Sequence, residues 1–427
     1  MNILLVVHRF WPELAGTEVY TLNLARQLAA RHQVWVYFRD HREQAPGFRA
    51  TDGQIAGVSV RRVSLNGTPQ VRGLAGRVGG RYWRFVASYR NPAIERDFEA
   101  TLERLRPDVV HVQHLMYLSA RLIELARRQR IPVIVTLNDF WFKCNNAVLL
   151  RADGSICADK EHFRACADCA SGGRRRPAPM RWLLARLLEA RDRQLRQALR
   201  SAQCVISPSR FLRDEYAREG YLAAEAVRVI EYGIDTRGAL AHQARAAGEP
   251  VRFAYVGSLA PHKGVHILIE AFNGVQGAAR LDIYGSLEAN PEYAARLQSA
   301  ISHPQAKLRG ALERQQLWPV LSQTDALIVP SIWYENSPVI IQEARAARVP
   351  VIGSALGGIA EKVQDGVNGR LFAAGDSQAL RSVLQAVVDA PEQLEHWRAH
   401  LPPASDIADH ARRLEEVYRE VLEKRSG

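Results

Sequence analysis

One pattern occurs twice along the chain: short apolar runs alternate with stretches of helical periodicity. In the first half the apolar runs are residues 3–7, 34–38, 109–112 and 131–137. In the second half the pattern restarts with residues 252–256, 280–284, 326–329 and 350–352. This alternation is typical of parallel βαβ units. The sequence therefore predicts an α/β fold with two doubly wound, Rossmann-like sheets.

Length supports the same division, because 427 residues exceed what a single hydrophobic core usually holds. We predict a first α/β domain at residues 1–240, whose sheet closes with a strand at residues 204–207. A second domain follows at residues 241–404, after a polar linker. The last part, residues 405–427, is a helix with one apolar stripe, which must pack on a neighbour. We expect it to cross back to the first domain.

Composition excludes several classes of protein. The chain is 47% hydrophobic and 24% charged, which excludes disordered and fibrous chains. No run of about 18 apolar residues occurs, so we expect no transmembrane helix. The first apolar run is too short for a secretory signal, which favours the cytoplasm. The net charge of +12 favours anionic partners such as sugar nucleotides or lipid headgroups, but no nucleic-acid-binding module is recognisable.

The loop after the third apolar run of the second half leads into a predicted helix. We expect Ser337 as the helix N-cap and Pro338 as the first helical residue, followed by Val339. The free N–H groups of such a helix start favour a diphosphate. Glu343, further along the helix, can accept hydrogen bonds from a ribose diol, and Glu335 can reach the hydroxyls of a hexose. Two glutamates at this spacing also occur on ordinary solvated helices, so the surrounding residues must decide.

Residues 335–343 read Glu-Asn-Ser-Pro-Val-Ile-Ile-Gln-Glu and resemble the E-x7-E motif of the family-four glycosyltransferases. The resemblance extends to residues 255–264, 353–361 and 365–369. Members of this family have the GT-B fold, in which two Rossmann-like domains face each other across a cleft. The resemblance therefore implies this fold, and a retaining transfer from a nucleoside-diphosphate sugar that needs no metal.

The resemblance also assigns roles to single residues of the donor side. Lys263 would stabilise the charge that grows on the departing diphosphate. Ser258 stands where the family usually has an arginine, so another basic residue would have to compensate, and Arg9 and Arg210 are candidates. Gly358 is expected to allow close approach of a backbone.

The loop at residues 12–18 resembles the G-G-x-E loop of the same family, with Ala15 in place of one glycine. The N–H groups of Gly16 and Thr17 would then contact the phosphate or the transferred sugar. The alternative is a plain turn between a strand and a helix.

Residues 135–141 resemble the T-L-H-D-x-W element of the family, but Asn138 replaces the histidine. Asparagine cannot take up a proton, so it would only orient hydroxyl groups, and Asp139 gains importance. His111 and His114 are further candidates, although a histidine at a strand end is more often a structural residue.

Four cysteines lie in a polar insertion near residues 144–175. Their spacing is C-x12-C-x8-C-x2-C, and four thiolates with a terminal C-x-x-C suit a structural zinc ion. Reduced thiols and a disulfide remain alternatives. The four residues are Cys144, Cys157, Cys166 and Cys169.

Two basic stretches are candidates for contact with an anionic membrane. Residues 174–200 contain three consecutive arginines and a helix with leucines on one face and arginines on the other. Residues 77–90 mix arginines with Tyr82, Trp83 and Phe85. Basic residues meet lipid headgroups and aromatic residues meet the interface. The alternative is a helix that packs in the core and exposes a charged face.

Together these features predict transfer of a hexosyl group from a nucleoside-diphosphate sugar to a hydroxyl acceptor. We expect a lipid-linked saccharide as the acceptor, in bacterial surface polysaccharide synthesis at the inner face of the membrane. A soluble acceptor is one alternative. The other is a protein that binds sugar nucleotides without turnover, which the residues at positions 138 and 258 keep open.

Overall fold

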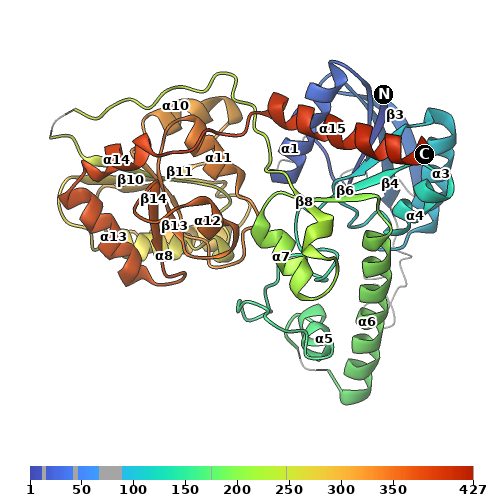
Figure 1. The fold of residues 1–427 in the computed structure, drawn as a ribbon. Coiled ribbons are helices and arrows are strands. Elements are labelled where there is room, and N and C mark those ends of the chain that lie inside the picture. Colours follow the sequence, from blue (N-terminus) through green and yellow to red (C-terminus); the bar gives the residue numbers. More distant parts are fainter. Residues whose placement is uncertain (12–15, 42–46, 67–88, 175, 247, 427) are drawn as a thin grey trace. The chain divides into compact units, whose positions relative to one another are not determined.

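The computed structural model describes residues 1–11, 16–41, 47–66, 89–174, 176–246 and 248–426. The chain forms two compact units: Met1–Gly233 together with Ile407–Gly427, and Ile234–Asp406 (Figure 1). Each unit is built around one sheet of mainly parallel strands with helices packed on it. The predicted α/β fold with two doubly wound sheets is therefore confirmed. The basic stretch at residues 77–90 lies almost entirely outside the described residues.

In the described part of the first unit, eight strands form a sheet in the order β3-β4-β2-β1-β5-β6-β7-β8. Neighbouring strands are parallel except for the antiparallel pair β3 and β4. The strands are β1 (Asn2–Val7), β2 (Gln33–Arg39), β3 (Gly47–Ile55), β4 (Val58–Asn66), β5 (Val109–Val112), β6 (Val133–Thr136), β7 (Cys204–Ser207) and β8 (Val227–Val229). The prediction that β7 closes the sheet was wrong, because β8 pairs with its free edge. Three residues are too few to show a strand period.

The helices of the first unit connect these strands and cover the sheet. Besides the C-terminal helix, those in the described residues are α1 (Gly16–Ala29), α3 (Pro92–Leu105), α4 (Arg121–Arg128), α5 (Arg164–Ala170), α6 (Ala178–Arg200), α7 (Arg210–Arg218) and a short 3-10 turn, η1 (Ala224–Ala226). Only the later part of α6 is buried, from Ala185 onward. Figure 1 shows α5 and the beginning of α6 lying away from the sheet of this unit.

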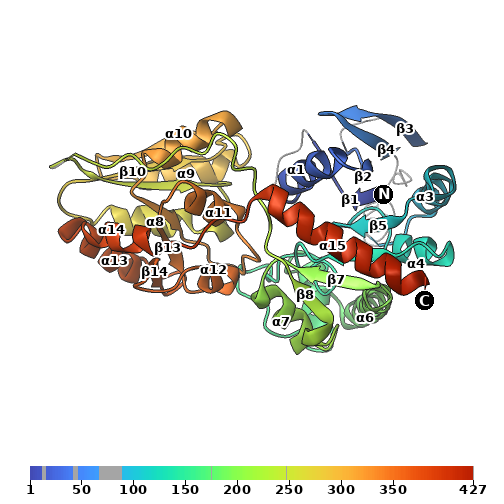
Figure 2. The same ribbon diagram turned by 45° about the horizontal axis from the view of Figure 1, so that its top comes forward.

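The C-terminal helix α15 (Ile407–Ser426) belongs to the first unit and packs on α1 (Figure 2). Two buried hydrogen bonds hold it there. The Tyr418 hydroxyl lies 2.7 Å from His111 Nδ1, and His410 Nε2 lies 2.7 Å from the Tyr20 hydroxyl. Burial and the neighbouring His410 lower the pKa of His111 to about 3, and burial lowers the pKa of His410 to about 4. Both histidines are therefore neutral where α15 docks.

The second unit contains an all-parallel sheet in the order β11-β10-β9-β12-β13-β14. The strands are β9 (Val251–Val256), β10 (Ala279–Tyr284), β11 (Ala306–Gly310), β12 (Ala326–Val329), β13 (Val351–Ser354) and β14 (Gly369–Phe372). One hydrophobic cluster packs the sheet against α8, α9, α13 and α14, and another packs it against α10, α11 and α12. These helices are α8 (Val265–Phe272), α9 (Pro291–Ala300), α10 (Leu317–Ser322), α11 (Val339–Ala346), α12 (Gly357–Lys362), α13 (Ser377–Asp389) and α14 (Gln393–Ala399).

The chain enters the second unit at Ile234 and leaves it at Asp406, and these two points lie side by side. The Ile234 N–H donates to Ser405 O over 2.9 Å, and the Thr236 hydroxyl donates to the Asp406 carboxylate over 2.5 Å. Residue 240, where the sequence placed the domain boundary, lies in the polar stretch that follows. Among the described helices, none is long and apolar enough to span a bilayer.

The two neutral histidines predict an acid-sensitive fold. A histidine in the unfolded chain titrates near pH about 6.5, so below this value the unfolded chain binds more protons than the folded chain. The free energy of unfolding should then fall by about 1.4 kcal/mol per pH unit for each histidine as pH drops from 6.5 towards 4. Denaturant unfolding at a series of pH values measures this slope.

A His410→Gln variant removes one of these titrating groups and should show a shallower slope by about 1.4 kcal/mol per pH unit. His400→Gln, which changes an exposed histidine, is the control and should keep the wild-type slope. Identical slopes in His410→Gln and the wild type would contradict the neutral state of His410.

Candidate functional site

The carboxyl ends of β9, β12 and β13 lie next to one another in the second unit, because these strands are neighbours in one parallel sheet. The strand order reverses between β9 and β12, since β10 follows on one side and β13 on the other. Ligands of open α/β sheets bind at such a reversal, beyond the carboxyl ends of the strands. The loops after these three strands therefore form the candidate site.

Two glycines let these loops touch through their backbones. Gly264 has φ +71°, and a Cβ atom on it would collide with the carbonyl oxygen of Pro330. A Cβ atom on Gly358 would collide with the carbonyl oxygen of Asn336, and the Gly358 N–H donates to Glu335 O over 2.6 Å. Any side chain at either position would force two loops apart. Gly358 thus serves close approach between two segments of the protein.

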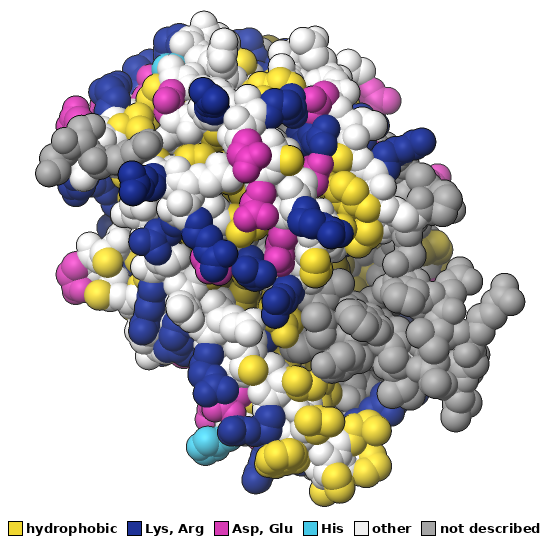
Figure 3. Space-filling view, turned by 90° about the vertical axis from the view of Figure 1, so that its right-hand side faces the viewer, with side chains coloured by type: hydrophobic (Ala, Val, Ile, Leu, Met, Phe, Trp, Pro, Cys, Tyr) yellow, Lys and Arg dark blue, Asp and Glu magenta, His cyan; other side chains and the backbone are white. Residues whose placement is uncertain are grey.

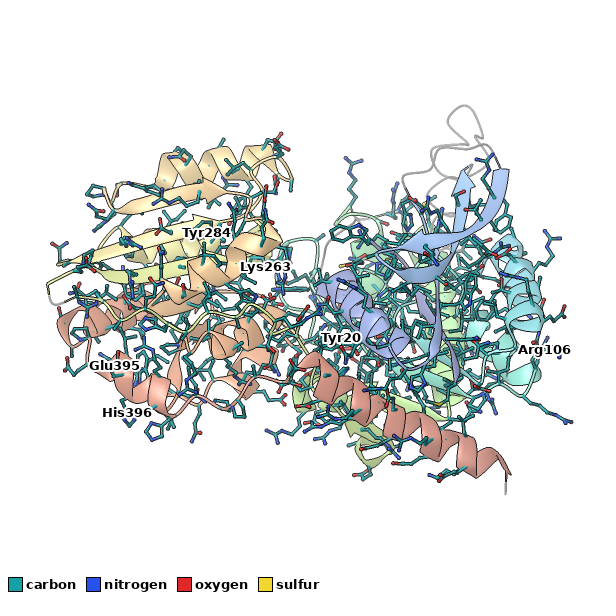
Figure 4. All side chains as sticks on the ribbon, turned by 90° about the horizontal axis from the view of Figure 1, so that it is seen from above. Tyr20, Arg106, Lys263, Tyr284, Glu395 and His396 are labelled. Atoms are coloured by element: carbon teal, nitrogen blue, oxygen red, sulfur yellow. The ribbon has the colours of Figure 1, made fainter. Side chains whose placement is uncertain are left out.

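The Glu335 carboxylate is the centre of this site and is buried. Its Oε1 accepts three hydrogen bonds: from Lys263 Nζ at 2.6 Å, Trp333 Nε1 at 2.8 Å and Ser331 Oγ at 2.9 Å. Lys263, labelled in Figure 4, ends the short turn η2 (Pro261–Lys263) after β9. Its ammonium group also lies 4.9 Å from the centre of the Trp333 ring. The structure therefore joins the predicted lysine and the predicted glutamate in one ion pair.

Electrostatics keep Glu335 ionised. Burial by itself raises the pKa of this carboxyl, but the Lys263 charge and the hydrogen bonds from Lys263, Trp333 and Ser331 outweigh it and hold the pKa below its ordinary value. Oε2 takes part in none of these three bonds. Glu335 can therefore accept a hydrogen bond from a ligand hydroxyl.

Glu343 lies in α11 and is 4% exposed. Its Oε1 accepts a hydrogen bond from Arg314 Nη1, which belongs to the short turn η3 (Arg314–Gln316). Sequence analysis missed Arg314, because no local pattern ties η3 to α11 and only the fold brings them together. The Arg314 side chain is 46% exposed, so this cation remains open to a ligand.

The helix after β12 begins one residue later than predicted. Pro338 has φ −60° and ψ 115° and is the N-cap, so the first helical residue is Val339. Ser337 makes no capping hydrogen bond, which corrects the prediction that it is the N-cap. The extended ψ of Pro338 turns the chain before the first helical turn and carries Ser337 out of reach of the helix N–H groups. Ser337 Oγ is buried and has no hydrogen-bond partner among the described residues.

Ser258 lies in the loop after β9 and is exposed. Its carbonyl oxygen accepts a hydrogen bond from the Tyr255 hydroxyl over 2.8 Å. This bond holds the loop that leads to Lys263, and it uses only the backbone of Ser258. The side chain supplies no positive charge, whereas Arg314 is a further cation of the second unit, beside Glu343.

In the first unit, Asp139 follows β6 and accepts two hydrogen bonds. His114 Nε2 lies 2.8 Å from Oδ2, and the Trp141 N–H lies 2.8 Å from Oδ1. His114 Nδ1 also accepts from the Met116 N–H over 3.1 Å. Nδ1 therefore acts as the acceptor, and Nε2 is the nitrogen that donates to Asp139. His114 thus holds Asp139 in place, while the Asp139 side chain stays partly exposed.

His8, at the end of β1, packs on the His114 ring with 4.1 Å between ring centres. Burial, and then the neighbouring His114, Arg9 and His41, hold the pKa of His8 well below its ordinary value. Its Nε2 accepts from Arg9 Nε over 3.1 Å, so the proton of the neutral ring is on Nδ1. Nδ1 is buried and has no hydrogen-bond partner in the part of the chain that the structure describes.

Asn138 and His111 are both engaged by the protein itself. The Asn138 amide donates to Gln113 O and accepts from the Tyr232 hydroxyl. His111 is fully buried between the Tyr418 hydroxyl and Thr136 Oγ1, which lies 2.8 Å from its Nε2. His111 is therefore a structural residue, whereas His114 lies beside a partly exposed carboxylate.

Gly16 and Thr17 form the first turn of α1. Residues 12–15, which complete the predicted loop, lie outside the described residues. The Thr17 carbonyl oxygen accepts a hydrogen bond from the Thr21 hydroxyl over 2.7 Å.

The zinc site predicted for Cys144, Cys157, Cys166 and Cys169 is not formed. All four residues are described and all four are free thiols. Within the described residues, no three His, Cys, Asp or Glu side chains gather so that they could hold a metal ion. The donor set as arranged does not fit zinc.

Two family models match the chain. Residues 14–237 match the model described as Glycosyltransferase Family 4, and residues 239–400 match the model described as Glycosyl transferases group 1. The first match alone covers more than half of the chain.

Curated relatives are similar over part of their length. The amylovoran biosynthesis glycosyltransferase AmsK of Erwinia amylovora is 30% identical over 175 residues, which cover 38% of this chain and 42% of that protein. The alpha-maltose-1-phosphate synthase of Mycolicibacterium smegmatis is 27% identical over 254 residues, covering 53% of this chain and 65% of that protein. The chain thus spans about half the length of the curated relatives it matches.

Solved structures are similar over nearly the whole chain. Sucrose-phosphate synthase from Thermosynechococcus elongatus superposes with a TM-score of 0.70 at 18% identity, covering 99% of both chains. HepE from Anabaena, in complex with UDP and glucose, superposes with a TM-score of 0.64 at 18% identity, covering 98% of this chain and 100% of that one. This likeness confirms the predicted fold class, GT-B with two Rossmann-like domains.

The contact between the loops predicts a large cost for a side chain at position 264. Gly264→Ala combines a strained positive φ with a collision against Pro330 O, and should lower the free energy of unfolding by about 3 kcal/mol or more. Gly310→Ala is the matched control, because Gly310 has φ +81° and open space around its Cα. It should cost only about 1–2 kcal/mol. Equal losses in the two variants, measured by denaturant unfolding, would show that the loops do not meet at Gly264.

Proposed function

Because the chain belongs to the family-four glycosyltransferases, we propose that it transfers a hexosyl group from a nucleoside-diphosphate sugar to a hydroxyl acceptor. The observation that carries this proposal is the buried, ionised Glu335 paired with Lys263 beside the start of α11. A carboxylate in this setting recognises hydroxyl groups, and a lysine beside it recognises a phosphate. A sugar nucleotide carries both groups.

The donor is held by residues of the second unit. Glu335 Oε2 accepts a hydroxyl of the hexose, and the Glu343 carboxylate, 4% exposed, accepts the ribose diol. The diphosphate meets the start of α11, where Ser337 Oγ lacks a partner in the described chain and the N–H groups of the first turn are directed outward. Lys263 and Arg314 supply positive charge there.

The transfer retains the configuration at the anomeric carbon. The bond between this carbon and the diphosphate oxygen breaks, and its electron pair leaves with the nucleoside diphosphate. The acceptor oxygen bonds to the same face of the sugar, and its proton passes to the departing phosphate. The positive charge of Lys263 stabilises the leaving group, a task for which other transferases use a metal ion.

Residues of the first unit act on the acceptor side. Asp139, held by His114, presents a partly exposed carboxylate that orients the acceptor hydroxyl. Asn138 holds the segment between β6 and Asp139 through its bonds to Gln113 and Tyr232. The N–H groups of Gly16 and Thr17 contact the phosphate or the transferred sugar.

The acceptor is a lipid-linked saccharide. Two relatives support a role in polysaccharide biosynthesis: AmsK is named for amylovoran biosynthesis, and WcaL of Salmonella typhimurium is named as a putative glycosyltransferase of colanic acid biosynthesis. An enzyme with such an acceptor works at a membrane surface, and we place it peripherally at the cytoplasmic face.

Titration calorimetry of UDP, GDP and ADP without added metal tests the donor site. One nucleotide should bind selectively, and Glu343→Ala should weaken its binding by roughly 10- to 100-fold, because a charged partner of the ribose is lost. Glu395→Ala, which changes an exposed glutamate of the same unit, should leave the affinity unchanged. Absence of binding by the wild type, or full affinity in Glu343→Ala, would refute the donor site.

Glu335→Gln tests the role of the buried charge with little change in shape. The variant keeps an acceptor for Trp333 and Ser331 but removes the charge opposite Lys263. Release of nucleoside diphosphate from the selected sugar nucleotide should slow by roughly 100-fold, while nucleotide affinity stays close to that of the wild type. Unchanged release would exclude Glu335 from the reaction.

A further inference from the structure

The region formed by α5 and the first turns of α6, residues 162–189, exposes large apolar side chains. We call this region the tip. Trp182 is 64% exposed, Leu183 is 54% exposed and Met180 is 46% exposed. Trp182 is the most exposed of the large hydrophobic side chains in the described chain. Single exposed apolar residues are ordinary on a protein surface. Three such residues within four positions form an apolar patch, and a patch of this kind usually marks an interaction site.

The burial of α6 differs from the expectation of one continuous leucine face. Leu188, Leu195 and Leu199 are buried and hold the later turns of the helix to the first unit. Leu183, one helical turn before this segment, is exposed. The helix is therefore divided: its second half packs in the core, and its beginning carries an apolar patch without a partner among the described residues.

Arginines surround this patch. The tip contains six arginines against Asp168 and Glu189, a net charge of +4. Arg181 Nη2 pairs with Asp168 at 2.6 Å, and Arg186 Nη1 pairs with Glu189 at 2.7 Å. In the part of the chain that the structure describes, the side chains of Arg164, Arg174 and Arg176 form no ion pair. Both acidic groups are thus neutralised within the tip, and the excess charge is positive.

A groove of about 690 Å³ lies between α5 and α6 in the tip. Its lining mixes apolar and cationic side chains: Phe163, Arg164, Arg176, Arg181, Trp182 and Ala185. Figure 3 shows hydrophobic side chains gathered beside Lys and Arg at the lower end of the view, the end where α5 and the start of α6 lie in Figure 1. The surface therefore offers apolar contact and positive charge at the same place.

We propose that the tip docks on the surface of an anionic lipid bilayer. Met180, Trp182 and Leu183 enter the interfacial region, where tryptophan is favoured and apolar side chains leave water. Arg164, Arg174 and Arg176 meet the phosphates of the headgroups. A nucleic acid would match the arginines but leave the apolar patch in water. A second copy of the chain would bring one +4 tip against another, which charge repulsion opposes.

The tip continues directly into the buried half of α6, which is bonded to the rest of the first unit, so docking orients that unit. Arg191, buried in α6, donates to Trp141 O over 2.9 Å, and Lys160 Nζ donates to Asp192 Oδ1 over 2.9 Å. Trp141 in turn donates its N–H to Asp139. The docking surface is therefore joined through α6 to the carboxylate that we assign to the acceptor. The docking inference is based on the exposed apolar side chains and the positive charge of the tip. Only the purpose of docking, which is access to a lipid-linked acceptor, rests on the proposed function.

Flotation of the full chain with vesicles tests this inference. Wild type should float with vesicles that contain phosphatidylglycerol and stay behind with pure phosphatidylcholine, and added salt should weaken the binding. The double variant Trp182→Ser, Leu183→Ser should bind anionic vesicles at least ~10-fold more weakly, because the inserted apolar surface is lost. Leu287→Ser is the matched control, since Leu287 is 41% exposed in the second unit, and it should float like the wild type.

A second variant separates the charge from the apolar patch. Arg174→Gln combined with Arg176→Gln should lower binding to anionic vesicles by several-fold and reduce its dependence on salt. Full flotation of the Trp182, Leu183 variant would overturn the inference, as would equal flotation with neutral vesicles. A dimer that the tip variant abolishes, or binding to RNA without flotation, would assign the surface to those partners instead.

The two proposals fail separately. Nucleotide titration of the tip variant should match the wild type, because the tip contains none of the residues that we assign to the donor. A protein that binds the nucleotide but never floats contradicts docking alone. A protein that floats but binds no nucleotide contradicts the glycosyltransferase proposal alone.

Discussion

The ion pair between Lys263 and Glu335 is the interaction on which the second unit's site depends. A buried carboxylate without a partner is strongly unfavourable, and breaking a buried pair typically costs about 3–5 kcal/mol. Lys263 follows β9 and Glu335 follows β12, so the pair ties two strand ends together. Gly264 makes this geometry attainable, because only a residue without Cβ lets the loops approach so closely. Charge and backbone contact thus position Glu335 before any ligand arrives.

Several histidines of the first unit are buried and neutral. His8 and His111 are buried, and their pKa values are lowered. His111 in β5 bonds to Tyr418 of α15, and His410 of α15 bonds to Tyr20 of α1. Among the histidines near the strand ends, His114 differs, because its ring holds a carboxylate that stays partly exposed.

In the insertion after β6, two sequence patterns predicted more than the structure forms: the cysteine spacing and the leucine face of α6. The cysteines gave a zinc-like spacing and lie near one another, yet among the described residues no three metal-ligating side chains gather closely enough to hold a metal ion. The leucines of α6 suggested a single face, yet the helix extends past the edge of the core, so only its second half is covered. Helical periodicity reports which residues share a face, but not how far the neighbouring layer reaches.

The sequence by itself determined the two α/β units, the strands at their centres, and Glu335 and Glu343 as candidate donor residues. These follow from periodicity and from a motif whose residues are close in the chain, so local physics suffices. The tertiary structure alone decided that Arg314 meets Glu343, that His111 is structural, and that Trp182 is exposed. It also placed the start of α11 at Val339. Each of these features depends on contacts between groups far apart in the chain or on a single backbone angle. Neither produces a periodic pattern in the sequence from which it could be predicted.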